Sequence, residues 1–348
     1  MSDSILRSEI FEQPEVLHRL LTDGAAEVEA IAAHLRDRDV RHIVIAARGS
    51  SDNAARYAQY VFGAYNRLTV TLATPSLFTR YLAPPRMTNA LVIGISQSGQ
   101  SPDLVAVVEE GRRQGCPTLA ITNVADSPLG ATADHALALR AGREQSVAAT
   151  KTYTAQLTAL AMLSTALAQD EARRLELARV PSLAASALGV DDEAIVAAAE
   201  ALKGAGHGVV LGRGFNFTTA FEIALKAKEL ACVAVEPYSS ADFQHGPIAL
   251  IETGFAAIVV NVAGAVSHEV DDLLRDITGR GARPVVLSNL PSSLALASAP
   301  IVLPDALPEW LSPIVAIMPG QLLAFHLSRL RGFDPDRPRG LHKVTRTT

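Results

Sequence analysis

Short apolar runs rich in β-branched residues alternate along the chain with longer segments whose apolar residues recur at helical spacing. The apolar runs predict buried strands at 42–47, 90–95, 118–122, 208–211, 256–260 and 284–287. The longer segments predict helices at 52–62, 102–114, 154–166, 219–232 and 270–279. Strands that helices cover on both faces appear as nearly continuous apolar runs. The alternation therefore predicts an α/β fold with doubly wound parallel sheets.

The chain also repeats itself at an offset of 165 or 166 positions. The matched pairs are Gly49 and Gly214, Gly99 and Gly264, Asn123 and Asn289, and Gln156 and Gln321. Four matches in one register predict two tandem doubly wound α/β domains. We expect an N-terminal helical segment at 1–28, a first domain at 29–180, a helical connector at 181–201, a second domain at 202–332 and a tail at 333–348.

Composition narrows the function classes. Of the 348 residues, 49% are apolar and 19% are charged, which excludes disorder as the main state. A formal net charge of −5 gives no positive field, so we expect no nucleic-acid partner. Two cysteines, Cys116 and Cys232, are too few for a disulfide framework or a closed zinc site. We found no signal peptide, and the longest apolar run identified, 255–266, is too short to span a membrane, so we expect a soluble cytoplasmic protein without a metal.

The loop at 94–101, with the sequence GISQSGQS, follows a predicted strand and leads into Pro102 and Asp103. A serine followed by proline is typical of a helix start. A serine-rich cap is the ordinary explanation, but three serines and two glutamines in six residues favour a site for a phosphate monoester. A second loop, 48–53, ends the neighbouring strand with similar residues. Gly212-Arg213-Gly214 lacks the third glycine of a dinucleotide fingerprint, and no Walker lysine motif occurs, so nucleotide binding is disfavoured.

Three charged residues share one stripe of the predicted helix at 221–230, because Glu222, Lys226 and Glu229 recur at i, i+4 and i+7. A solvated, salt-bridged face would explain such charges. Alanines and apolar residues fill most of the other positions, so we expect this stripe to face a cleft. A partly desolvated carboxylate beside an ammonium suits proton transfer. His245, next to a Gly-Pro turn, is a second acid–base candidate.

These motifs together resemble the sugar isomerase (SIS) domain family, in the branch that includes the isomerase half of glucosamine-6-phosphate synthase. The similar segments cover nearly the whole chain: EIFEQP at 9–14, SQSGQS at 96–101, SVAATKTYTAQ at 146–156, EIALKAKE at 222–229, QHGPIALI at 244–251 and DPDRPRGLHKVT at 334–345. The resemblance implies two SIS domains of flavodoxin-like fold, a phosphosugar isomerase activity and no cofactor.

The resemblance also assigns roles to individual residues. It implies that the phosphosugar is held by Ser50, Ser51, Ser96, Gln97, Ser98 and Ser101, with Val147 and Ala149 in the same substrate site. Glu229 matches the proton shuttle between C1 and C2, with Lys226 and Glu222 as supporting charges. His245 matches a ring-opening histidine that is donated across a homodimer. Lys343 matches a tail lysine that forms an imine with the ketose, although composition alone suggests only a frayed tail.

Three departures from the family pattern shape the functional expectation. Arg48 stands where the family usually has a small residue, and Ala149 stands where it has a serine. The chain starts where the synthase has a linker after its glutaminase domain, so we expect no glutamine-derived ammonia. We therefore expect an isomerising deaminase that converts glucosamine 6-phosphate to fructose 6-phosphate and ammonia. One alternative is a deglycase for a fructosyl-amine 6-phosphate. Another is a non-catalytic sugar-phosphate sensor, which would not need the five acid–base candidates together: Glu222, Lys226, Glu229, His245 and Lys343.

Overall fold

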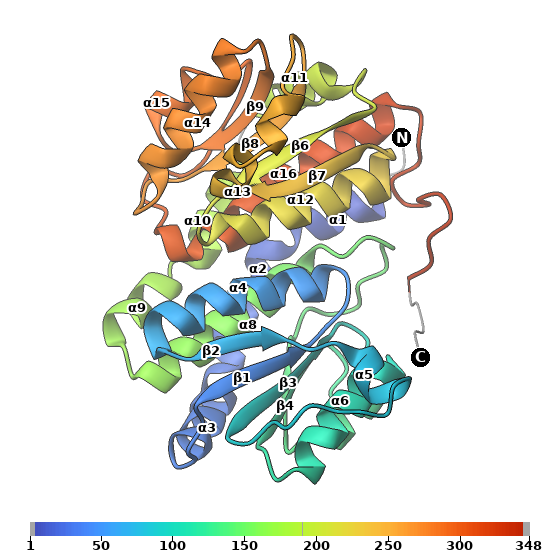
Figure 1. Ribbon diagram of the computed structural model, residues 1–348, viewed down its shortest axis with the longest axis vertical. Coiled ribbons are helices and arrows are strands. Elements are labelled where there is room, and N and C mark those ends of the chain that lie inside the picture. Colours follow the sequence, from blue (N-terminus) through green and yellow to red (C-terminus); the bar gives the residue numbers. More distant parts are fainter. Residues whose placement is uncertain (1–3, 190, 344–348) are drawn as a thin grey trace. The chain divides into compact units, whose positions relative to one another are not determined.

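A computed structural model describes residues 4–189 and 191–343, and it contains two parallel five-stranded sheets (Figure 1). Each sheet is the centre of one structural unit. The first-sheet unit comprises Glu15–Glu144, Lys151–Arg179 and 342–343; the second-sheet unit comprises 4–14, Gln145–Thr150 and Val180–Leu341. Each unit is thus assembled from separate stretches of the chain, and the tandem boundaries expected from the repeat remain a prediction.

The first sheet has the strand order β2-β1-β3-β4-β5. Its strands are β1 (His42–Ala46), β2 (Thr69–Leu72), β3 (Ala90–Ser96), β4 (Thr118–Thr122) and β5 (His135–Ala138). The helices up to α9 are α2 (Gln13–Asp23), α3 (Ala25–Arg36), α4 (Ser50–Asn66), α5 (Pro75–Thr79), α6 (Pro102–Arg113), α7 (Pro128–Thr132), α8 (Lys151–Ala168) and α9 (Glu171–Leu177). One core cluster packs Val92 of β3 and Ala120 of β4 against Val107 and Val108 of α6.

The second sheet has the order β10-β9-β8-β6-β7, which is the same topology in the second repeat. Its strands are β6 (His207–Gly212), β7 (Ala234–Ser239), β8 (Ala256–Asn261), β9 (Arg283–Ser288) and β10 (Ala299–Val302). Its helices are α1 (Ile5–Phe11), α10 (Val180–Leu188), α11 (Asp192–Leu202), α12 (Asn216–Ala231), α13 (Ser240–Gln244), α14 (Ser267–Gly279), α15 (Pro291–Leu294) and α16 (Ser312–Leu330), with 3₁₀ turns η1 (Pro247–Leu250) and η2 (Glu309–Leu311). The shared topology confirms the predicted fold class and the internal repeat.

All six predicted strands form, and the four strands that the apolar pattern did not predict are the edge strands of the two sheets. The two edge strands of the second sheet show why. Alternate residues of β10 are exposed, and β7 is only partly buried, so neither sequence has a continuous apolar run. All five predicted helices form too, and most extend beyond the apolar periodicity that marked them.

The apolar pattern did not predict a helix in the segment Glu309–Leu330, which contains η2 and α16. It spans 22 residues, and its most apolar 18-residue window has a mean hydropathy of 1.4, so by length and composition it would also suit a membrane crossing. In the second-sheet unit, however, 94% of its most apolar 18-residue window is buried. Its apolar character is therefore that of a core helix, which packs along α12 and α11 (Figure 1).

The chain's tail caps its first helix within the second-sheet unit. The carboxylate of Asp336 accepts hydrogen bonds from the backbone N–H groups of Ile5, at 3.1 Å, and Leu6, at 2.8 Å, and from the hydroxyl of Ser4, at 2.9 Å. A carboxylate at this end of a helix satisfies amide donors that have no partner inside the helix. The tail motif that contains Asp336 thus stabilises the start of α1.

We expect Asp336→Ala to lower the free energy of unfolding by about 1–2 kcal/mol, because two amide donors of α1 lose their acceptor. Urea denaturation measures this loss. Asp305→Ala, at an exposed aspartate, is the matched control and should change stability by less than about 0.5 kcal/mol. Equal losses in the two variants would contradict the capping role.

Candidate functional site

Two serine-containing loops meet at the carboxyl end of the first sheet. Strands β1 and β3 pair in parallel, with Ala46 opposite Gly94, so the loops that follow them are neighbours. The loop after β1 leads into α4 at Ser50, and the loop after β3 leads into α6 at Pro102, where the sequence predicted a helix start. Ligands of such sheets bind at these loops.

No side chain fits at Gly99, in the second of these loops. Its φ is +63°, and a Cβ there would lie 1.9 Å from the hydroxyl oxygen of Ser127. The hydroxyl of Ser96 accepts a hydrogen bond from the backbone N–H of Gly99 at 3.1 Å, which closes the turn. This packing leaves the backbone of the loop tightly folded in front of α6.

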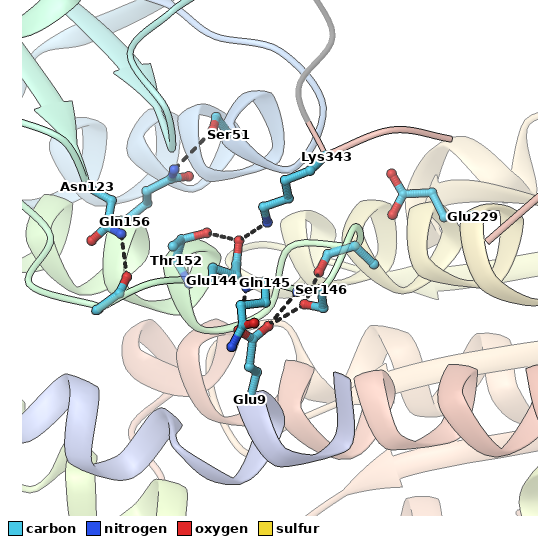
Figure 2. A network of polar contacts seen from close by, with 12 residues as sticks. Glu9, Ser51, Asn123, Glu144, Gln145, Ser146, Thr152, Gln156, Glu229 and Lys343 are labelled. Carbon is cyan, nitrogen blue, oxygen red and sulfur yellow. Dashed lines mark hydrogen bonds and ion pairs between the residues drawn. The ribbon is translucent and has the colours of Figure 1, made fainter. Parts of the chain in front are cut away.

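The serine and glutamine candidates fall into a buried group and a partly exposed group. Ser51 and Ser96 are buried, and Ser51 accepts a hydrogen bond from the amide of Gln156 at 3.0 Å (Figure 2). The candidates with partial exposure are Ser50, Gln97, Ser98 and Ser101. Ser101 precedes α6 without capping it through its side chain. The first-sheet unit therefore brings the six predicted phosphate-loop residues to one end of its sheet, and their binding of phosphate stays a prediction.

Arg48 adds a positive charge to these neutral donors. Its guanidinium donates to one carboxylate oxygen of Asp103, from Nε at 3.0 Å and from Nη2 at 2.8 Å. Asp103 is buried in the first turn of α6, whereas about half of the Arg48 side chain is exposed. The pair ties the β1 loop to the start of α6 and keeps a cation at the predicted anion site. In the sequence, Arg48 stood out only as a departure from the family pattern.

Glu144 is a functional candidate that the sequence analysis missed. Its side chain is fully buried, and it accepts hydrogen bonds from the backbone N–H of Thr152 at 3.1 Å and from the Thr152 hydroxyl at 2.9 Å. The ammonium of Lys343 lies 2.5 Å from the same carboxylate (Figure 2). The structure thus places the tail lysine in the first-sheet unit on a pre-arranged acceptor, rather than in a frayed tail.

Glu9, in the EIFEQP motif of α1, holds the backbone of the segment before α8. Its buried carboxylate accepts from the N–H groups of Gln145, at 2.6 Å, and Ser146, at 3.1 Å, and from the Ser146 hydroxyl at 2.5 Å (Figure 2). The residues of this segment, including the predicted substrate contacts Val147 and Ala149, are not helical. Val147 and Ala149 are partly exposed, and their substrate role stays a prediction.

The charged stripe of α12 forms as its spacing predicted, in the second-sheet unit. The Lys226 ammonium lies 3.3 Å from Glu222 and 2.5 Å from Glu229. Lys226 and Glu222 are almost fully buried, whereas the Glu229 side chain is 25% exposed. Burial by itself lowers the pKa of Lys226, but the carboxylates of Glu229 and Glu222 outweigh burial and raise that pKa above its ordinary value. The stripe therefore reaches solvent only at Glu229.

His245 lies at the exposed end of α13, directly before Gly246, whose φ is +132°. Its imidazole has no hydrogen bond or ion pair with any residue that the structure describes. The second-sheet unit therefore brings Glu222, Lys226 and Glu229 together and leaves His245 apart from them on the surface. Across 4–189 and 191–343, no group of three or more His, Cys, Asp and Glu side chains is arranged to hold a metal.

Comparison with known proteins identifies the family. The SIS domain family matches residues 37–166 and 201–330, one match for each sheet. The chain belongs to the SIS domain family. Its glutamine–fructose-6-phosphate aminotransferase [isomerizing] relative from Thermococcus kodakarensis is 35% identical over 344 residues, which cover 96% of this chain and 56% of the relative. This SIS chain thus spans little more than half the length of the curated relatives it matches.

Solved SIS structures agree with this assignment. One, from Silicibacter pomeroyi DSS-3, is named as a candidate phosphosugar isomerase; it is 33% identical, with a TM-score of 0.87 over 96% of this chain and 100% of that one. Another is the C-terminal domain of glucosamine-fructose-6-phosphate aminotransferase from Francisella tularensis, which is 29% identical, with a TM-score of 0.87 over 97% of this chain and 98% of that one. The resemblance stated from the motifs is confirmed at the level of the family.

We expect Lys226→Met to destabilise the protein by about 3–5 kcal/mol, because it removes the buried cation between two carboxylates. The pKa of Lys226 is raised in the folded state, so its stabilising contribution is complete below its unfolded pKa of about 10.4 and falls only as pH rises through the folded pKa. The loss measured by urea denaturation should therefore be equal at pH 7 and pH 9. Lys228→Met, at an exposed lysine 3.9 Å from Glu236, should cost less than about 1 kcal/mol. A similar cost for both lysines would contradict the buried pairing.

We expect Glu144→Gln to release Lys343. The amide keeps the shape of the carboxylate but loses the charge that binds the ammonium, so acetic anhydride should label Lys343 several times faster than in the parent protein. Mass spectrometry measures the labelling. The control is Glu200→Gln, which removes the partner of Lys203 in an exposed pair at 3.6 Å and should hardly change the labelling of Lys203. Unchanged labelling of Lys343 would show that Glu144 does not restrain it.

Proposed function

We propose that this chain is a phosphosugar aldose–ketose isomerase, and that its reaction is the isomerising deamination of glucosamine 6-phosphate to fructose 6-phosphate and ammonia. The observation that carries the proposal is the α12 stripe, in which a buried ammonium is flanked by two carboxylates and only Glu229 reaches solvent. The names of the SIS relatives support the phosphosugar class. The deaminase reaction itself is our proposal.

In this proposal the phosphate is bound at the carboxyl end of the first sheet, by Ser96, Ser98 and Ser101 together with the backbone at the start of α6. A helix N-terminus favours an anion, and hydroxyl and amide donors match phosphate oxygens. The exposed half of Arg48 supplies the positive charge that the serines lack. Such contacts are the same in the ground state and the transition state, so they govern KM more than kcat.

The proposed proton transfer uses Glu229. After the sugar ring opens, the carboxylate of Glu229 takes the proton from C2, and the electron pair of the C2–H bond forms the enolamine. O1 takes up a proton as the enolamine forms. The same carboxyl group then returns the first proton to C1 while the amine nitrogen gives up a proton, which leaves a hydroxyl on C1 and an imine at C2. Lys226 stabilises the negative charge that develops during the transfer. Glu222, whose side chain is fully buried, supports the charge of Lys226.

Release of the amine follows at C2. In our proposal the neutral amine of Lys343 adds to the C2 imine, ammonia leaves, and water then hydrolyses the lysine imine to the ketone of fructose 6-phosphate. An ammonium is not a nucleophile, so Lys343 must first lose a proton. In our proposal it passes to the carboxylate of Glu144, 2.5 Å away.

We further propose that the working form is a homodimer in which His245 of each chain opens the substrate ring at the partner's site. The support is the exposure of His245 and its lack of a partner among the described residues of its own chain. Neutral imidazole can take a proton from one sugar oxygen and deliver it to another near neutral pH.

The experiment that tests the function is an incubation of the purified chain with glucosamine 6-phosphate, in which ammonia and fructose 6-phosphate are measured together. We expect equal amounts of the two products. Activity only with a fructosyl-amine 6-phosphate would favour a deglycase. Saturable binding of fructose 6-phosphate without turnover of either substrate would favour a sugar-phosphate sensor.

We expect Glu229→Gln to lower the rate of C2-proton exchange with deuterium oxide, and of ammonia release, by about 10²–10⁴. Glutamine is nearly isosteric with glutamate but cannot accept the proton. Nuclear magnetic resonance follows the exchange, and Glu236→Gln, at an exposed carboxylate of β7, is the control that should keep the parent rate. Parent rates in Glu229→Gln would remove Glu229 from the reaction.

Glu229→Gln and His245→Ala subunits should complement each other if the histidine acts across a dimer. Each variant alone is expected to be inactive, and a mixed dimer contains one site with both parent residues. Activity of differently tagged, purified heterodimers is the measurement. Inactive heterodimers would indicate that each site takes both residues from one chain.

A further inference from the structure

The internal repeat pairs Glu144 with a second carboxylate, Glu309. Each glutamate lies 12 positions before the matched glutamine of its repeat, Gln156 or Gln321. Both glutamines are buried in the last long helix of their repeat, α8 or α16. The two glutamates therefore occupy the same position in the two halves of the chain.

The local backbone structure and the partners of this glutamate differ between the two halves. In the first repeat the residues after Glu144 stay non-helical until α8 begins at Lys151, and Glu144 is engaged by Thr152 and Lys343. In the second repeat helical structure begins at Glu309 itself, because η2 runs directly into α16. The early start of the helix leaves the Glu309 side chain next to the loop that follows β8.

Glu309 fills the position at that loop that corresponds to the predicted phosphate site. Its Oε2 accepts a hydrogen bond from the backbone N–H of Ala265 at 2.8 Å. A Cβ on Gly264 would lie 2.2 Å from its carboxylate carbon, and a Cβ on Gly214 would lie 3.7 Å from its Oε1. Gly264 and Gly214 are the repeat partners of Gly99 and Gly49 in the two serine loops. The carboxylate thus lies against both matching loops of the second sheet.

The scaffold of an anion site persists around Glu309, and buried asparagines, Asn216 and Asn261, stand at the positions of Ser51 and Ser96, but the partly exposed side-chain donors are lost. Arg213 binds Glu269 in the first turn of α14 at 2.7 Å, as Arg48 binds Asp103 in the first turn of α6. In the loop after β8, the residues at the positions of Gln97, Ser98 and Ser101 are Val262, Ala263 and Val266. A sugar phosphate would find no hydroxyl at these positions and would have to displace a carboxylate.

We propose that the carboxylate of Glu309 is a built-in occupant of a latent oxyanion subsite, and that it closes the second sheet to phosphate esters. Each chain then takes one sugar phosphate, at the first sheet. This second statement rests on the proposed function, whereas the latent subsite rests on the geometry of the second-sheet unit alone. The class of ligand that the opened subsite would accept is a small tetrahedral oxyanion, bound through backbone N–H groups such as that of Ala265.

The test compares phosphate binding by the full chain and by Glu309→Ala, with radiolabelled inorganic phosphate in equilibrium dialysis. We expect Glu309→Ala to bind one more phosphate per chain than the parent protein. A crystal structure of the variant with phosphate should place a phosphate oxygen within hydrogen-bond distance of the Ala265 N–H. Glu309→Gln, which keeps the side chain's shape, is the control and should bind no additional phosphate.

Three results would overturn the proposal. The first is a folded Glu309→Ala protein that binds no more phosphate than the parent. The second is additional phosphate that lies away from Ala265 in the crystal. The third, which needs no variant, is two fructose 6-phosphate molecules per parent chain in a calorimetric titration. If Glu309→Ala does not fold, Glu309→Ser takes its place, because a short hydroxyl also leaves the subsite empty. Failure of the proposed deaminase reaction would leave the phosphate counts unaffected, so the two outcomes are distinguishable.

Discussion

A buried carboxylate that accepts backbone hydrogens fixes where the last helix of the first repeat begins. Amide groups that leave a helix must find other partners, because an unpaired buried amide costs roughly 1–3 kcal/mol. Glu9 provides this partner for Gln145 and Ser146. The non-helical segment that results separates Glu144 from α8, and the function proposed for Lys343 depends on that separation. Before α16, helical structure starts earlier, at Glu309, and this matched glutamate meets a different neighbour.

The α12 stripe and the Glu144–Lys343 pair lie in different electrostatic environments. On α12 one cation is shared by two carboxylates in a buried setting, where unpaired charges are strongly unfavourable. Desolvation makes each of these interactions stronger than it would be in water, so the stripe is both a stability element and a chemical one. The Glu144–Lys343 pair combines a buried carboxylate with a partly exposed ammonium, which allows the lysine to exchange partners at lower cost.

The sequence predicted the central strands because they are buried on both faces, and the edge strands escaped because only part of each is covered. The α12 stripe was predictable from spacing alone, since i, i+4 and i+7 positions coincide on any helix. Glu9, Glu144 and Glu309 were not, because an isolated glutamate has no pattern and its partners lie far away in the chain. The repeat held the missing signal: extending the match of Gln156 and Gln321 backwards pairs Glu144 with Glu309.

The cap that Asp336 places on α1 also shortens the free part of the tail. Only six residues lie between this anchor and Lys343, and a fully extended chain of seven residue steps reaches about 25 Å. An amine on so short a linker has an effective concentration in the millimolar range, whatever the concentration of free amines around the protein. A longer linker would lower the effective concentration of the lysine without altering any residue that it touches. The number of residues between Asp336 and Lys343 is therefore itself a structural parameter of this chain.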